Sequence, residues 1–185
     1  MNIRFEKRAL LFSVLAVCLN APSFAGWQPD ESDSKQQSAS VAIAKFKAKK
    51  PELKSYFDKA YGYAILPGVT RVAVGFGGAY GRGLVIEGDR LIGSTGFSQV
   101  SSGIQFGAKH FSMIIFFKDR DALEQYKEGR VRFLGQAGID VITAGISGTP
   151  AYNDGVAIFA MNRFGLMAEF SYSGARFSYK PIDEK

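Results

Sequence analysis

The sequence is poor in the residues that build reactive and metal-binding sites. Among 185 residues it has 1 cysteine and 1 histidine, which excludes both a disulfide framework and a Cys/His zinc site. It also lacks the run of about 20 apolar residues that a membrane-spanning helix needs. The hydrophobic share is 46% and the charged share 22%, a balance that is typical of globular proteins. We therefore expect one folded domain with an extension.

The extension is predicted at the N-terminus, where the sequence has the three parts of a secretory signal peptide. Basic residues at 4, 7 and 8 precede an apolar stretch over residues 9–19, and a small-x-small site ends at Ala25. This pattern predicts cleavage after Ala25 and export to the periplasm. Lipoprotein cleavage before Cys18 is disfavoured, because the bulky Val17 stands where that processing requires a small residue.

Three segments follow from this division: a signal peptide over 1–25, a flexible polar tether over 26–37, and a single domain over 38–185. The domain begins with a helical pattern, since Ala39, Ala42, Ile43 and Phe46 have the i, i+3, i+4, i+7 spacing of one helix face. Pro51 suits the first turn of a second helical piece. We expect this helical unit to extend from about residue 38 to residue 60.

Beyond Tyr61 the pattern changes to short apolar or alternating runs separated by glycines, which predicts β-strands. Residues 87–90 favour a tight hairpin turn, and residues 119–129 form one helical pattern, with Asp119 as its cap. Regular strand–helix alternation is missing. The predicted fold is therefore α+β: antiparallel, glycine-rich β structure, sandwich- or barrel-like, with an N-terminal helical unit and one inserted helix.

The sequence lacks the patterns of the common catalytic sites. The glycine-rich stretch 75–83 is followed by a strand pattern, whereas a phosphate loop must be followed by a helix. Its glycines are better explained as bulges or close backbone contacts. His110 has no G-x-S-x-G nucleophile motif to serve. We expect no enzymatic activity, no catalytic residue, no cofactor, no metal site and no nucleic-acid partner.

Four ordered blocks, over residues 60–67, 75–85, 102–108 and 162–168, make the chain similar to the SYLF domain family. The similarity extends from about residue 38 to residue 179. It implies a non-enzymatic module that binds membrane lipid through an N-terminal amphipathic helix and nearby basic residues. The late block departs from the family, which often has Lys-Gly where this chain has Phe164-Gly165.

The basic excess of the chain lies in the predicted helical unit, where residues 35–59 hold seven lysines against two acids. A basic amphipathic helix can insert its apolar face at a lipid surface while its lysines meet anionic headgroups. The candidate lipid-binding residues, taken from the family resemblance and this pattern, are Lys45, Phe46, Lys47, Lys49, Lys50 and Lys54. Their expected partner is anionic phospholipid at a membrane of the cell envelope.

Two alternatives stay open. The apolar stripe of the helical unit could pack on the β structure, leaving the lysines as a solvated face. The protein could also be a structural or protein-interaction module of the envelope, since it has 16 phenylalanines and 8 tyrosines to supply a contact surface.

Overall fold

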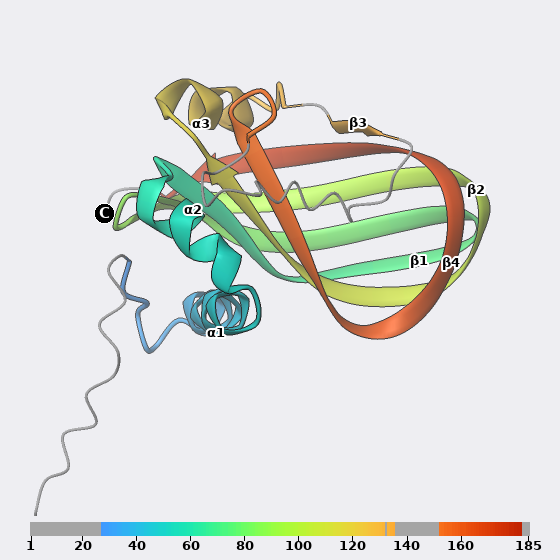
Figure 1. Ribbon diagram of the computed structural model, residues 1–185. Coiled ribbons are helices and arrows are strands. Elements are labelled where there is room, and N and C mark those ends of the chain that lie inside the picture. The colour runs from blue at the N-terminus through green and yellow to red at the C-terminus, as the bar shows by residue number, and fades with distance from the viewer. Residues whose placement is uncertain (1–26, 132, 136–151, 183–185) are drawn as a thin grey trace, which may run out of the picture.

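The computed structural model describes residues 27–131, 133–135 and 152–182 and has the predicted α+β architecture. One antiparallel sheet has the strand order β1-β2-β4-β3, and three helices and a short 3₁₀ turn pack against it (Figure 1). The elements in chain order are α1 (Ser34–Lys49), η1 (Pro51–Leu53), α2 (Lys54–Lys59), β1 (Gly62–Glu87), β2 (Arg90–Phe117), α3 (Arg120–Lys127), β3 (Phe133–Gly135) and β4 (Val156–Pro181).

The sheet curls until the two ends of β1 lie beside each other, as Figure 1 shows. A Cβ atom added to Gly83 would stand 2.1 Å from the carbonyl oxygen of Ile65, and one added to Gly62 would stand 2.7 Å from that of Ile86. The strands therefore form two layers. The first layer holds residues 62–74, 106–117 and 156–168, and the second layer holds residues 76–87, 90–102 and 171–181.

The short strands expected from the sequence are segments of three long ones, so that expectation is corrected. Glycine and proline interrupt the apolar pattern without ending the ladder, because β-bulges absorb the irregularity. The β1–β2 register shifts between Leu66 and Val69 and again between Val74 and Phe76, where Gly75 has a φ of 72°. The predicted turn at residues 87–90 is confirmed, with Gly88 at a φ of 56°. One of the apolar runs that predict strands beyond Tyr61, over residues 141–144, lies outside the described residues.

The helical unit covers part of the outer face of the first layer, whereas Val72, Val74 and Phe106 on the rest of that face are exposed. Its predicted apolar stripe is buried and belongs to one core cluster with Ile114, Phe116 and Phe159 of the sheet. The aromatic rings in this cluster meet at tilted or edge-on angles, for example Phe57 and Phe116 with centroids 4.9 Å apart. The stripe thus packs on the β structure, which was the alternative to its insertion in lipid.

The prediction of a flexible tether over residues 26–37 is wrong from Trp27 onward. Trp27 is buried in the same core cluster. Helix α1 begins at Ser34, four residues earlier than expected, because the Asp33 carboxylate caps it by accepting from the backbone amide of Lys35 at 2.8 Å. The polar composition predicted a flexible tether, but Trp27 packs in the core and the Asp33 cap starts α1 within the segment. The predicted signal peptide lies outside the described residues.

The space between the two layers is filled by a second core cluster, and α3 closes its open end. Phe111 and Phe117 of the first layer meet Phe97 and Phe177 of the second. The inserted helix is confirmed, with Asp119 accepting from the backbone amide of Ala122. Its Tyr126 reaches into the core and forms a 2.6 Å hydrogen bond with Thr95 Oγ1.

Candidate functional site

The lysines proposed from the sequence differ in whether their charge is available to bind a lipid headgroup or is paired with an acid of the protein. Lys45 and Lys49 are exposed and make no ion pair within the described ranges. Lys50 Nζ lies 3.8 Å from Glu52, and Lys54 Nζ lies 2.7 Å from Asp58. Glu52 and Asp58 therefore partly neutralise the lysine cluster of residues 35–59.

Lys47 is partly withdrawn from solvent. Its Nζ lies 4.6 Å from the centroid of the Phe57 ring, a cation–π contact. Burial lowers the pKa of Lys47, a shift that Asp58 opposes and Lys54 adds to. A lysine that contacts a ring in this way is less available to bind a lipid headgroup.

Phe46 is a core residue in this structure. Its side chain is 0% exposed and sits between α1 and the sheet. A lipid at the protein surface cannot touch it without α1 leaving the sheet. We therefore correct the inclusion of Phe46 among the lipid-contacting residues: its position on the apolar stripe was right, but the stripe faces the core.

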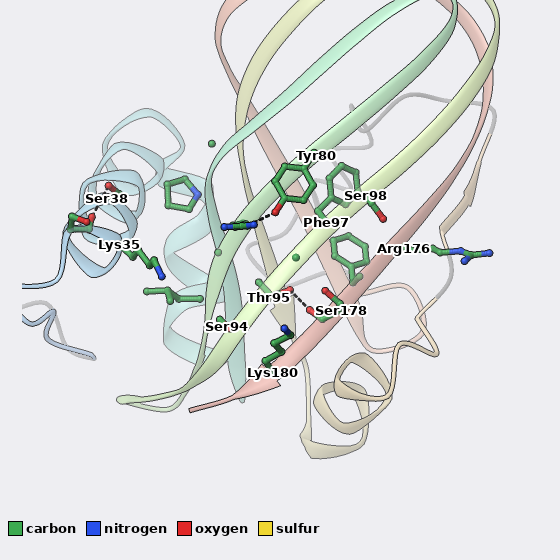
Figure 2. A pocket seen from close by; sticks show the side chains of 18 residues that line it. Lys35, Ser38, Tyr80, Ser94, Thr95, Phe97, Ser98, Arg176, Ser178 and Lys180 are labelled. Atoms are coloured by element: carbon green, nitrogen blue, oxygen red, sulfur yellow. Dashed lines mark hydrogen bonds between the residues drawn. The ribbon is translucent and has the colours of Figure 1, made fainter. Parts of the chain in front are cut away.

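A groove lies between the N-terminal part of α1 and the outer face of the second layer, and it gathers basic residues that are far apart in the sequence. We call it the basic groove. Its volume is about 890 Å³. The bases that line it are Lys35, Arg82, Arg176 and Lys180, and no acidic residue is among its described lining residues. Figure 2 shows Lys35 on the helix side and Lys180 on the sheet side, with Arg176 extending away from both.

Hydroxyl groups and the aromatic residues Tyr80, Phe97 and Phe177 complete the walls of the basic groove. Ser38 stands on the helix, and Ser94, Ser98 and Ser178 stand on exposed positions of the strands. The Nε atom of Arg82 donates a hydrogen bond to the Tyr80 hydroxyl, and its guanidinium carbon lies 5.5 Å from the Tyr80 ring centroid. The guanidinium of Arg82 is therefore held in place while its remaining N–H groups stay available to an anion.

A smaller pocket of about 370 Å³ adjoins the basic groove and continues along α1 from Ser34 to Lys45. It is lined by Lys45 and Arg163, and it shares Ser34, Ser38 and Pro67 with the groove. The Nη1 atom of Arg163 donates to the Pro67 carbonyl at 3.2 Å. Of the lysines proposed from the sequence, Lys45 is the one that the structure brings close to this region.

His110 lies on β2 beside Arg163, which lines this pocket. His110 Nδ1 lies 3.0 Å from Thr70 Oγ1, and its pKa is lowered by burial and, to a smaller degree, by Arg163. Within the described ranges, no group of three or more His, Cys, Asp or Glu residues could hold a metal ion. The basic side chains that line the groove and this pocket can attract an anion.

Sequence reasoning missed the basic groove because its bases come from α1, β1 and β4. A usable signal was present in the last strand, where Arg176, Ser178 and Lys180 alternate with Phe177 and Tyr179. Such alternation predicts a strand with one polar face. The sequence does not reveal that Lys35 and Ser38 of α1 line the same groove as this polar face.

The helices of the described residues are all too short or too polar to cross a membrane. Comparison of the chain with family models, with curated proteins and with solved structures finds no match.

Proposed function

We propose that this protein is a non-enzymatic lipid-binding module of the bacterial cell envelope, which attaches to membrane surfaces that display anionic phospholipid. The observation that carries the proposal is the basic groove, with Lys35, Arg82 and Lys180 converging on one space and no acidic residue in its described lining. The similarity to the SYLF family and the predicted signal peptide support the same location and ligand class.

The residues of the groove suit a phosphate group. Arginine and lysine side chains form charge-assisted hydrogen bonds with phosphate oxygens, and serine hydroxyls such as those of Ser94 and Ser98 add further donors. Phosphate also occurs free in solution, but there is a reason to favour a phospholipid headgroup at a membrane over the free ion. That reason is the spread of exposed charge beyond the groove, to Lys45 and Arg163, because each base near an anionic membrane adds about 1 kcal/mol.

The lysines named from the sequence keep a smaller part in this proposal. Lys45 and Lys49 add to the attraction, whereas Lys47, Lys50 and Lys54 already contact groups of the protein. The groove is the place where a headgroup is bound, and the lysines at the end of α1 contribute to the field around it.

Vesicle flotation tests the proposal, with vesicles of phosphatidylcholine alone and of phosphatidylcholine mixed with phosphatidylglycerol. We expect binding only to the anionic vesicles and weaker binding as salt rises, because exposed charges are screened over about 8 Å at physiological ionic strength. The triple variant Lys35→Glu, Arg82→Glu, Lys180→Glu should lose vesicle binding. The control triple variant Lys59→Glu, Lys118→Glu, Arg120→Glu makes the same change of net charge outside the groove and should retain most of it.

Three results would contradict the proposal. Equal losses in the two triple variants would mean that net charge, and not the groove, attracts the protein. Full competition by inorganic phosphate would assign the groove to a soluble anion. A stable complex with an envelope protein, formed without lipid and with no vesicle binding, would favour the structural or interaction module.

A further inference from the structure

Five large apolar side chains are exposed together where the sheet bends between its two layers. We call them the bend patch. Their exposed fractions are 55% for Val72, 69% for Val74, 80% for Phe76, 73% for Val100 and 72% for Phe106. Soluble domains rarely expose so many large apolar groups on neighbouring positions, and such patches mark sites of interaction.

The register of β1 and β2 places the bend patch on a single outer surface. Val74 is opposite Phe106, and Val100 is opposite Gly78, two positions from Phe76. The sequence holds no charged residue over positions 72–81 or 91–108. Both strands therefore carry no charged residue through the whole bend. A bend that faced only water could carry charged residues.

The bend patch is continuous with the basic groove. Arg82 and Tyr80 line the groove, and Gly78 and Phe76 follow on the same outer face of β1, at alternate positions. On β2, Ser98 lines the groove and Val100 begins the patch. The six residue-to-residue steps from Val100 to Phe106 give a contour of about 20 Å at roughly 3.3 Å per step.

We propose that the bend patch inserts into the hydrocarbon of a membrane leaflet whose anionic headgroups occupy the basic groove. This inference rests on the proposed function and gives it a second, apolar contact. The order along the strands, cations first and uncharged apolar groups beyond them, matches the order of headgroups and acyl chains in a leaflet. Peripheral membrane elements bury their apolar faces by about 5–10 Å, a depth within the reach of the bend.

A membrane fits the bend patch better than a protein partner, because the groove beside it has cations and no described acid to pair with a mixed-charge protein surface. A second copy of the chain would place this same basic groove next to its own image if the contact were two-fold symmetric, which like charges oppose. A bilayer of anionic lipid offers negative headgroups to the basic groove and apolar acyl chains to the bend patch.

The first experiment reports on insertion at one position. The variant Phe76→Trp is made in a Trp27→Phe background, because Trp27 is the sole tryptophan of the chain. Its fluorescence should move to shorter wavelength on phosphatidylglycerol-containing vesicles and should be quenched by lipid that is brominated in the acyl chain. Ile182→Trp in the same background is the control, since Ile182 is also exposed but lies just after the end of β4, beside Ile92 and away from the bend. Its fluorescence should not be quenched.

The second experiment measures the contribution to binding. Phe76→Ser and Phe106→Ser should each weaken vesicle binding by about ten-fold or more, since burying a phenylalanine side chain changes an equilibrium constant by at least that factor. Ile182→Ser should leave binding unchanged. The melting temperatures of all three variants should stay near that of the parent protein, because the substituted side chains are exposed.

The outcomes separate this inference from the proposed function. If the parent protein binds anionic vesicles while the tryptophan at position 76 stays unquenched and the serine variants bind normally, the insertion is refuted and the function stands. If the parent protein binds no vesicle, both are refuted. If the parent protein is a dimer that Phe76→Ser converts to a monomer with unchanged vesicle binding, a second copy covers the patch and the inference is wrong.

Discussion

The two layers of the sheet are made from the same three strands, yet β2 is covered on its outer face at residues 111–117 and open at residues 94–100. In the first layer, every residue from 111 to 117 is buried, because one face of the strand meets the core between the layers and the other meets the helical unit. In the second layer, buried Thr95, Phe97 and Gln99 alternate with exposed Ser94, Ser98 and Val100. A continuous apolar run thus marks the covered layer, and an alternating run marks the open one.

This difference explains where ligand-facing groups can gather. An outer face that is covered by helices holds apolar side chains such as Ile114 and Phe116 and has no room for charge. The open face carries Arg82 and Lys180, and the edge of α1 that reaches over it adds Lys35. The basic groove lies at the border between the covered face and the open face, where α1 supplies one wall and the uncovered sheet supplies the other.

Removing the cover of the first layer should have the largest effect on stability. Phe46→Ala deletes a side chain that is 0% exposed between α1 and the sheet, and we expect a loss of about 3–5 kcal/mol in the free energy of unfolding. Val41→Ala, at an exposed position of the same helix, should change it by roughly 0.5 kcal/mol or less. Urea denaturation of both variants measures the difference. Similar values for the two would mean that α1 does not pack as described.

The contact between the layers is tested by adding a single methyl group. Gly83→Ala places a Cβ atom 2.1 Å from the backbone oxygen of Ile65, so the layers must separate locally, at a cost of about 1–3 kcal/mol. Gly78→Ala is the matched control, because its Cβ atom would meet nothing closer than the Gln99 oxygen at 3.9 Å. Thermal unfolding should show a clear drop for the first variant and little change for the second. A tolerated Gly83→Ala would contradict the close approach of the layers.

The closure of the core by α3 gives a smaller effect. Tyr126→Phe removes the hydroxyl that bonds Thr95 Oγ1, while Thr95 keeps its 2.9 Å hydrogen bond to the Ser178 carbonyl. We expect a loss of about 0.5–1.5 kcal/mol, measured by urea denaturation. Burial raises the pKa of the Tyr126 hydroxyl, so it remains protonated, and the loss should not depend on pH near neutrality. An unchanged stability would show that the ring alone holds α3 in place.

The parts of the fold that the sequence predicts are those in which local pattern and burial agree. The stripe through Phe46, the turn at Gly88 and the cap at Asp119 each depend on neighbours in the chain, and the structure confirms all three. The joining of short runs into long strands was missed, since a bulge at Gly75 and a strand end have similar sequences. The basic groove was missed because its lining combines Lys35 of α1 with Arg176 and Lys180 of β4, which are more than a hundred positions apart in the sequence.

His110 gives the smallest and most local test, because it lies where β2 passes from the covered to the open part of the sheet. Burial, and secondly the charge of Arg163, lower its pKa from the ordinary value of about 6.5. Protonation is thus less favourable in the folded state than in the unfolded one. The neutral imidazole therefore contributes to the free energy of unfolding. This contribution is complete above the pKa of the unfolded state and is lost as the pH falls through the pKa of the folded state. Because the chain has 1 histidine, its imidazole signal in NMR spectra can be followed without ambiguity.

Arg163→Gln should raise the pKa of His110 toward the ordinary value, but only in part, since burial is the larger cause. Lys118→Gln, which removes a charge from an exposed site after the end of β2, should leave the titration unchanged. The loss of stability on acidification should shrink slightly in the Arg163 variant. A His110 pKa at or above the ordinary value in the parent protein would mean that the imidazole is more solvated than the Thr70 contact and the neighbouring Arg163 indicate. The border between the covered and open parts of the sheet would then lie further along β2.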